Sequence, residues 1–129
     1  RAHKYNFGVA LYDDSVVYRV ENEALSQRLH AFGEETRSYK TFVSPEPRRL
    51  FHGTSVHAAR AIVREGFRLP KRAGMFGRGI YFADSALKSL QYCDQYGLIL
   101  VCDVDLGKTR TLTSAKNSFD PEQDLSRHP

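Results

Sequence analysis

The sequence predicts an α+β fold. Candidate strands and helices, five or six strands and three helices, follow one another irregularly and lack the strand–helix repeat of a parallel α/β sheet. The chain has 129 residues, of which 41% are hydrophobic, which is enough for one domain with a core. We therefore expect residues 1–129 to form a single domain.

The amino-terminal part predicts two strands and a helix. Lys4–Leu11 and Val16–Val20 are rich in the aromatic and β-branched residues that favour strands. Asn22 has the side chain of a helix N-cap, and a helix is expected over Glu23–Phe32 because apolar residues recur there at helical spacing. Gly33 is the expected end of that helix. The residues at helical spacing are Leu25, Leu29 and Phe32.

The central part predicts strands on either side of a proline-rich turn and then a second helix. Thr41–Val43 and Leu50–His52 are the candidate strands. Thr54 or Ser55 is expected to cap the helix, and Gly66 is expected to end it. Its expected apolar face consists of Val56, Ala59, Ile62 and Val63.

The carboxyl-terminal half predicts a strand at Gly79–Ala83, a short helix capped by Asp84, and the most apolar strand of the chain, Leu98–Asp105. The last strand is expected to begin fully buried and to end with alternating faces. Beyond it, only Arg110–Thr113 has strand character, and the remainder is expected to form a loop.

Composition narrows the classes of partner. Lys and Arg number 19 against 15 Asp and Glu, so a mild affinity for anions is expected, either nucleic acid or a phosphorylated small ligand. An ordinary basic domain has the same balance of positive and negative residues.

No apolar run is long enough to span a membrane, so no membrane partner is expected. Because the chain begins at Arg1 without an apolar signal segment, we expect a piece of a longer protein.

The cysteines and histidines do not suggest a metal site. Cys93 and Cys102 form no C-x-x-C pair, and no Cys/His ladder has zinc spacing, so no metal is expected. Cys102 lies in an apolar run and is expected to be a buried thiol. Free thiols favour a reducing compartment, and we expect an intracellular location, nuclear or cytoplasmic.

Several polar and aromatic residues between residues 50 and 92 have the types needed to bind a flat, polar ligand. Gly53 has no side chain, so its backbone N–H and C=O could pair with a planar carboxamide. Tyr81 and Tyr92 could form the two walls of a stacking slot, and Ser89 would lie on the same helical face as Tyr92. Alternatively, both tyrosines belong to the core or the surface.

Two charged or titratable residues have equally open roles. His52 could be a structural histidine or a ligand contact. Arg68 could meet a phosphate or could be a solvated surface arginine. The glycines at positions 74, 77 and 79 do not have dinucleotide-fold spacing, and they precede a strand instead of a helix.

A basic nucleic-acid-binding domain stays an alternative function for the chain, although neither exposed aromatics nor a recognition helix supports it.

Together, several motifs resemble a known family. In order and spacing they are similar to the catalytic domain of the poly(ADP-ribose) polymerase-like, diphtheria-toxin-type ADP-ribosyltransferases, over residues 16–113. The motifs are Leu50–Thr54, Gly66–Arg68, Met75–Asp84, Lys88-Ser89 and Tyr92-Cys93, preceded by Val20–Asn22 with Leu25 and Arg28.

The resemblance implies a split, mostly antiparallel β-sheet that binds NAD as a substrate in a cleft. It implies that His52 holds the ribose next to nicotinamide, and that Gly53 and Ser89 pair with the carboxamide. It implies that Tyr92 stacks on the nicotinamide ring while Tyr81 lines the pocket. His52 and Tyr81 are the implied catalytic residues. The implied NAD-binding residues are His52, Gly53, Thr54, Arg68, Gly79, Tyr81, Phe82, Ala83, Ser89 and Tyr92.

Two further residues match looser parts of the resemblance. The segment from Arg68 to Arg78 is expected to lie over the adenosine and diphosphate half of NAD. Lys88 matches a position near the acceptor, which the resemblance implies to be a protein or a nucleic acid.

The sequence departs from the family pattern at its end. The family's catalytic glutamate follows a long loop after the strand that corresponds to Leu98–Asp105. Glu122 is the only glutamate in that region, and its turn-like context does not match, so the role is not carried onto it. The resemblance therefore implies a sheet that lacks its C-terminal strands, either because they lie outside this chain or because the chain is a short variant. An active NAD-dependent ADP-ribosyltransferase and a catalytically silent NAD- or ADP-ribose-binding or protein-interaction module both fit.

Overall fold

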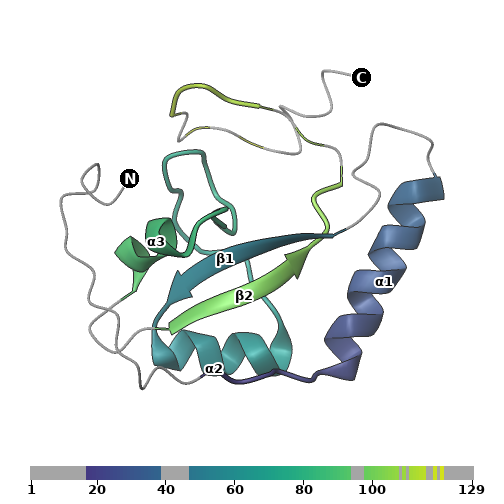
Figure 1. Ribbon diagram of the computed structural model, residues 1–129. Coiled ribbons are helices and arrows are strands. Elements are labelled where there is room, and N and C mark those ends of the chain that lie inside the picture. Colours follow the sequence, from purple (N-terminus) through teal and green to yellow (C-terminus); the bar gives the residue numbers. More distant parts are fainter. Residues whose placement is uncertain are drawn as a thin grey trace.

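The computed structural model describes residues 17–38, 47–93 and 98–107, together with residues 109, 111–115, 118 and 120. Two strands form the central ribbon of Figure 1, with the longer helices at one side and at one end of it. The elements are α1 (Glu23–Ser38), β1 (Arg48–Thr54), α2 (Val56–Glu65), α3 (Ala86–Ser89), the 3-10 helix η2 (Leu90–Tyr92) and β2 (Leu98–Val104). This mixture agrees with the predicted α+β class.

The two strands pair antiparallel, and β1 has partners on both of its edges. The register sets Arg48 opposite Val104 and Thr54 opposite Leu98. On the other edge of β1, Phe51 and Ala83 exchange two backbone hydrogen bonds of 2.8 Å each. The segment that carries Phe51 to Thr54 is therefore held between β2 and the chain around Ala83.

Helix α2 begins and ends as the sequence predicts. The hydroxyl of Ser55 accepts a hydrogen bond from the N–H of Ala58 at 3.1 Å, which caps the first turn. Gly66 ends the helix at φ +88°, and its N–H donates to the carbonyl of Ile62 at 2.8 Å. Only Ser55 separates β1 from α2, so the end of the strand and the helix are fixed relative to each other.

The buried hydrophobic residues come from β1, α2 and the segment before α3, and the buried polar residue Ser89 ends α3. Leu50 of β1, Ala59 of α2 and Ala83 are buried, and Ser89 is 2% exposed. In the part of the chain described here, no helix is both long and apolar enough to cross a bilayer.

The structure corrects the prediction of a strand over Val16–Val20. Residues 17–20 form no strand, and the Val17 and Tyr18 side chains are 91% and 81% exposed. β-Branched residues favour a strand only where a partner strand pairs with them and a face is buried. The predicted strands Lys4–Leu11 and Thr41–Val43 lie outside the described residues.

The structure also moves the boundaries of two helices. Helix α1 passes through Gly33 and ends at Ser38, and a polar contact of 3.2 Å between the side chains of His30 and Glu34 spans the predicted end. Gly33 is not among the glycines with positive φ, so it does not form the left-handed cap that the prediction required. Helix α3 follows Ser85 as its N-cap instead of Asp84.

The predicted strands of the second half are corrected as well. In Gly79–Ala83 only Ala83 takes part in a bridge, because the carbonyl of Tyr81 bonds the His52 ring instead of a strand. β2 does not begin fully buried, since Leu98 is 44% exposed and Val101 is 58% exposed. Residues 111–113 form no strand.

Candidate active site

A cavity of about 450 Å³ opens between the end of β1, one side of α2 and the segment that leads to α3. Its lining is mostly apolar, with a few polar groups contributed by backbone, tyrosine and charged side chains. This size and composition are typical of sites for small organic ligands. The strand supplies His52, Gly53 and Thr54 to the lining.

The His52 ring is held in a defined orientation on the lining. Its Nδ1 atom lies 2.7 Å from the carbonyl oxygen of Tyr81. Because a carbonyl can only accept, Nδ1 carries the proton, and in the neutral ring Nε2 keeps a lone pair. The ring centroid also lies 4.9 Å from that of Phe67 and 5.6 Å from that of Phe82. The backbone and the two phenyl rings thus fix the direction of Nε2.

Gly53 is required by the close packing of β1 against α3. A Cβ atom at this position would lie 2.0 Å from the carbonyl oxygen of Ser89 and 3.1 Å from the Cys93 sulfur. Successive residues of a strand direct their N–H and C=O to alternate edges, so Gly53 shares the edge of Phe51, whose groups bond Ala83. The N–H and C=O of Gly53 therefore point away from β2, on the side of the cavity.

Tyr81 joins the lining to the glycine-rich loop. Its hydroxyl donates to the carbonyl of Gly77 at 2.6 Å and accepts from the N–H of Phe76 at 3.0 Å. The ring also lies against Gly74, where a Cβ would come within 2.8 Å of the hydroxyl. The Tyr81 side chain therefore adds to the two backbone hydrogen bonds between Gly74 and Gly77 that close this turn, and it also contributes to the cavity wall.

Tyr92 and Ser89 lie in very different environments although only three residues separate them. Tyr92 lines the cavity and is 59% exposed, so its side chain is accessible to a ligand. Neither Tyr81 nor Tyr92 is among the ring contacts of the described residues, so the two rings do not stack on each other. Ser89 is buried behind Gly53 and does not line the cavity.

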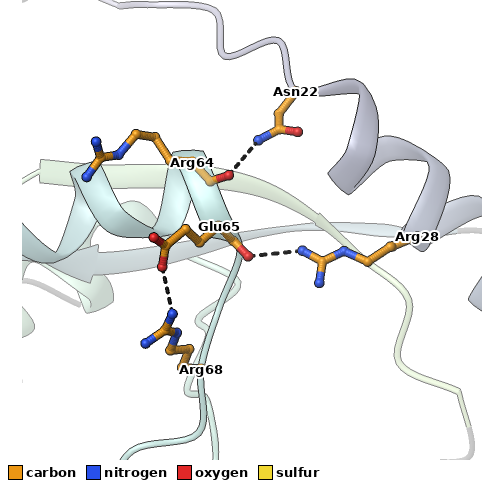
Figure 2. Close-up of polar contacts among 5 residues, drawn as sticks. All are labelled: Asn22, Arg28, Arg64, Glu65 and Arg68. Atoms are coloured by element: carbon orange, nitrogen blue, oxygen red, sulfur yellow. Dashed lines mark hydrogen bonds and ion pairs between the residues drawn. The ribbon is translucent and has the colours of Figure 1, made fainter.

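The charged part of the lining is an ion pair at the end of α2, shown in Figure 2. An Nη atom of Arg68 lies 2.8 Å from a carboxylate oxygen of Glu65, and both residues line the cavity. The Arg68 side chain is 81% exposed and that of Glu65 is 53% exposed, so solvent screens this pair. An anionic ligand group would compete with Glu65 for the guanidinium.

Comparison with known proteins identifies the family. Residues 8–127 match the poly(ADP-ribose) polymerase catalytic domain. The chain belongs to this family. It is 37% identical over 119 residues to poly [ADP-ribose] polymerase 1 of Gallus gallus and 32% identical over 115 residues to that of Danio rerio. These alignments cover 82% and 81% of this chain but only 11% and 10% of the relatives.

A third relative extends the comparison within the polymerase family. The chain is 37% identical over 87 residues to poly [ADP-ribose] polymerase tankyrase of Caenorhabditis elegans, which covers 60% of this chain and 4% of that protein. The chain thus spans about a tenth or less of the length of these curated relatives. The resemblance drawn from the sequence motifs is confirmed at the level of the family.

The structure brings most of the residues predicted from the polymerase resemblance to one cavity. On its lining are His52, Gly53, Thr54, Arg68, Gly79, Tyr81 and Tyr92. Phe82, Ala83 and Ser89 lie behind the lining: Phe82 against the His52 and Phe67 rings, Ala83 against Phe51, and Ser89 against Gly53. Arg78 and Lys88 are exposed and do not line the cavity. The ligand contacts of all these residues stay predictions.

Sequence reasoning missed the contribution of α2 to the site. Ala58, Ala61, Ile62 and Glu65 line the cavity, and their spacing of i, i+3, i+4 and i+7 defines one side of the helix. The small side chains of Ala58 and Ala61 on that side leave room for a ligand. The apolar face expected from the sequence shares only Ile62 with this side of the helix. Among the described residues no group of three or more His, Cys, Asp or Glu side chains could hold a metal ion.

Proposed function

We propose that this chain is an NAD-dependent ADP-ribosyltransferase domain, which transfers ADP-ribose from NAD to a protein or nucleic-acid acceptor and releases nicotinamide. The observation that carries the proposal is the meeting of His52, Gly53 and Tyr92 on the lining of one ligand-sized cavity. Membership of the polymerase family supports the same reaction. The groups on the lining match the chemical parts of NAD in turn.

The nicotinamide end would bind beside Gly53 and Tyr92. A primary carboxamide has one acceptor and two donors in a plane, and it can pair with the N–H and C=O of one residue at a strand edge. Gly53 directs both groups toward the cavity side, as the pairing of Phe51 with Ala83 requires. The accessible ring of Tyr92 offers a face on which the pyridinium ring can stack, which adds a cation–π attraction.

The ribose would bind through His52. With the proton on Nδ1 held by the Tyr81 carbonyl, Nε2 can accept a hydrogen bond from a ribose hydroxyl. The neighbouring Phe67 and Phe82 rings restrict rotation of the imidazole, so the hydrogen bond would form without reorganisation. His52 is in this scheme a binding and orienting group.

The diphosphate would meet Arg68. A guanidinium suits phosphate oxygens because its N–H groups form a planar fork. Arg68 is already close to Glu65 at 2.8 Å, so binding of a phosphate would require it to share or leave that carboxylate. Its high exposure makes the exchange possible at small energetic cost.

The chemistry needs mainly positioning and charge stabilisation. The C–N bond between the ribose C1′ and nicotinamide breaks, and its electron pair neutralises the pyridinium nitrogen. An acceptor oxygen then bonds C1′ and loses its proton to a base. Holding the ring, ribose and phosphates in one geometry lowers this barrier, and a carboxylate near C1′ would stabilise the positive charge that develops.

Incubation with NAD labelled in the adenylate part tests the proposal. Transfer predicts label that stays with the protein after denaturation, with an equal amount of free nicotinamide. The Tyr92→Ala variant should lose the transfer, while Tyr92→Phe, which keeps a ring, should retain most of it. If NAD raises the melting temperature but no label transfers, the catalytically silent binding module is the correct reading. If neither occurs, the proposal is wrong.

A further inference from the structure

We propose that Asn22, which directly precedes α1, and Arg28 of α1 are positioning residues for the ligand cavity. They fix the end of α2 and thereby the Glu65–Arg68 wall, which is the part of the lining expected to face the diphosphate side of NAD. This inference rests on the proposed function for the identity of the ligand. Its structural basis is a set of hydrogen bonds between two helices that lie far apart in the sequence (Figure 2).

The carboxyl end of α2 depends on α1 for its hydrogen bonds. The last four carbonyls of a helix have no partner within the helix. In α2 the carbonyl of Ile62 accepts from Gly66 N–H, whereas those of Val63 and Arg64 both accept from the Asn22 amide, at 2.9 and 3.1 Å. The fourth, that of Glu65, accepts from an Nη atom of Arg28 at 3.0 Å. Three of the four carbonyls are therefore satisfied by α1.

The side-chain oxygen of Asn22 makes a further hydrogen bond, which caps α1. Its Oδ1 atom accepts from the N–H of Leu25 at 3.2 Å and so caps the first turn of α1. One side chain thus ends one helix and begins another. Because the two tasks use different atoms, a substitution can remove one of them and keep the other.

Gly66 makes the close approach of the two helices possible. A Cβ atom on Gly66 would lie 2.7 Å from the Arg28 guanidinium and 3.0 Å from the Leu25 side chain. Positive φ at Gly66 turns the chain sharply out of α2, so the next two residues, Phe67 and Arg68, reach the cavity. Phe67 then packs edge-on against the His52 ring at 4.9 Å.

The positive charge of Arg28, like its hydrogen bond, stabilises the carboxyl end of α2. The carboxyl end of a helix carries partial negative charge, which a nearby guanidinium stabilises. Arg28 bonds the backbone carbonyl of Glu65, and Arg68 bonds its carboxylate, so two arginines from different segments hold this residue in Figure 2. Loss of the hydrogen bonds from Asn22 and Arg28 to α2 should therefore displace Glu65 and Arg68. The side of the cavity formed by Gly53 and Tyr92 should stay in place.

The test compares two probes that occupy different parts of the cavity. ADP-ribose contains the diphosphate but no nicotinamide, and benzamide mimics the nicotinamide alone. Asn22→Ser keeps a capping oxygen for α1 but is too short to reach the α2 carbonyls. We expect it to weaken ADP-ribose binding about tenfold, which is the effect of a net hydrogen-bond contribution, while benzamide affinity changes less than about twofold.

Arg28 supplies an independent variant and a chemically matched control. Arg28→Met should weaken ADP-ribose binding selectively, and Arg28→Lys should restore part of it because the ammonium can still donate to the Glu65 carbonyl. Arg19→Met removes the same charge from a residue that is 88% exposed and pairs with Glu21, so it should leave both probes unchanged. Titration calorimetry well below the melting temperature measures all affinities.

The outcomes separate this inference from the proposed function. A general loss of folded protein would lower the apparent affinity for both probes by the same factor, and that result would overturn the positioning role. Unchanged ADP-ribose binding in Asn22→Ser and Arg28→Met would overturn it as well. If the wild-type chain binds neither probe, the proposed function itself fails.

Discussion

At the residue scale, the orientation of the His52 ring makes a prediction that separates the two ends of NAD. His52→Ala removes the Nε2 acceptor but neither Gly53 nor Tyr92. We expect NAD affinity to fall about tenfold, the loss of one well-placed hydrogen bond, with benzamide affinity nearly unchanged. Calorimetric titration of both compounds measures the difference. His57→Ala, on an exposed position of α2, is the control. Equal losses for NAD and benzamide would contradict a ribose contact.

Also at the residue scale, the environment of Cys102 makes stability depend on alkaline pH. Burial, and secondly the charge of Asp103, raises the pKa of this thiol from 9.0 to about 11. Between these values the unfolded chain has lost the proton that the folded chain still holds, so the free energy of unfolding falls as pH rises. The stabilising contribution is complete below pH 9 and is lost as pH passes 11.

The Cys102→Ala variant isolates this contribution from those of all other groups in the chain. Denaturant unfolding of both proteins at intervals from pH 8 to pH 11 measures it. The difference in unfolding free energy between wild type and variant should narrow steadily above pH 9. Two curves that stay parallel would show that folding does not change the pKa of Cys102.

At the scale of elements, Tyr81 is expected to hold the turn over residues 74–77 closed. Tyr81→Phe keeps the ring but removes the hydroxyl that bonds Gly77 and Phe76. The two backbone hydrogen bonds between Gly74 and Gly77 remain in this variant, so the loss of the hydroxyl should raise the open fraction of the loop by only about tenfold. Brief trypsin digestion reports the opening, because Arg72 and Arg78 flank the turn and are exposed.

The control for the loop removes a hydroxyl from the other tyrosine of the cavity. Tyr92→Phe should leave the cleavage rates after Arg72 and Arg78 as they are in the wild type, because no hydrogen bond of the Tyr92 hydroxyl is present among the described residues. Equal cleavage of wild type and Tyr81→Phe would show that the loop is held by other contacts.

The elements also show what local sequence can and cannot predict. The sequence limits the cap of α2 to Thr54 or Ser55, of which Ser55 forms it, and reads Gly66 correctly as the end, because capping depends on neighbouring residues. The strand predicted at Gly79–Ala83 does not form, because the Tyr81 carbonyl is taken by His52, 29 residues away. Gly33 signals a helix end in isolation, yet α1 continues to Ser38. A long-range contact thus accompanies the first of these differences, and a local contact between His30 and Glu34 accompanies the second.

The same distinction applies to the site. Motif resemblance predicts His52, Gly53 and Tyr92, and the fold brings them to one cavity. The side of α2 that completes the cavity has no motif, and Asn22 and Arg28 are matched by the resemblance without any indication of what they contact. Their importance becomes visible only when the carbonyls at the end of α2 are followed to their donors.

At the scale of the whole molecule, ligand binding should stabilise the fold in a way that distinguishes a pocket from a basic surface. A ligand at a hundred times its dissociation constant stabilises the native state by about 2.7 kcal/mol. For a chain of 129 residues this corresponds to a rise in melting temperature of about 10 °C. We expect NAD to produce such a rise if it binds the cavity that joins β1, α2 and the glycine-rich loop.

The salt dependence of the melting temperature distinguishes binding of NAD in the cavity from binding of a polyanion to a basic surface. The formal charge of +4 would attract any polyanion, but that attraction is screened steeply between roughly 0.05 and 0.2 M salt. Carboxamide pairing and ring stacking in a largely apolar cavity are screened much less. Thermal melts with NAD and with a short oligonucleotide, at both salt concentrations, measure the contrast. The NAD shift should persist at the higher salt. An oligonucleotide shift that falls steeply with salt, with no NAD shift at either concentration, would identify a nucleic-acid-binding surface instead.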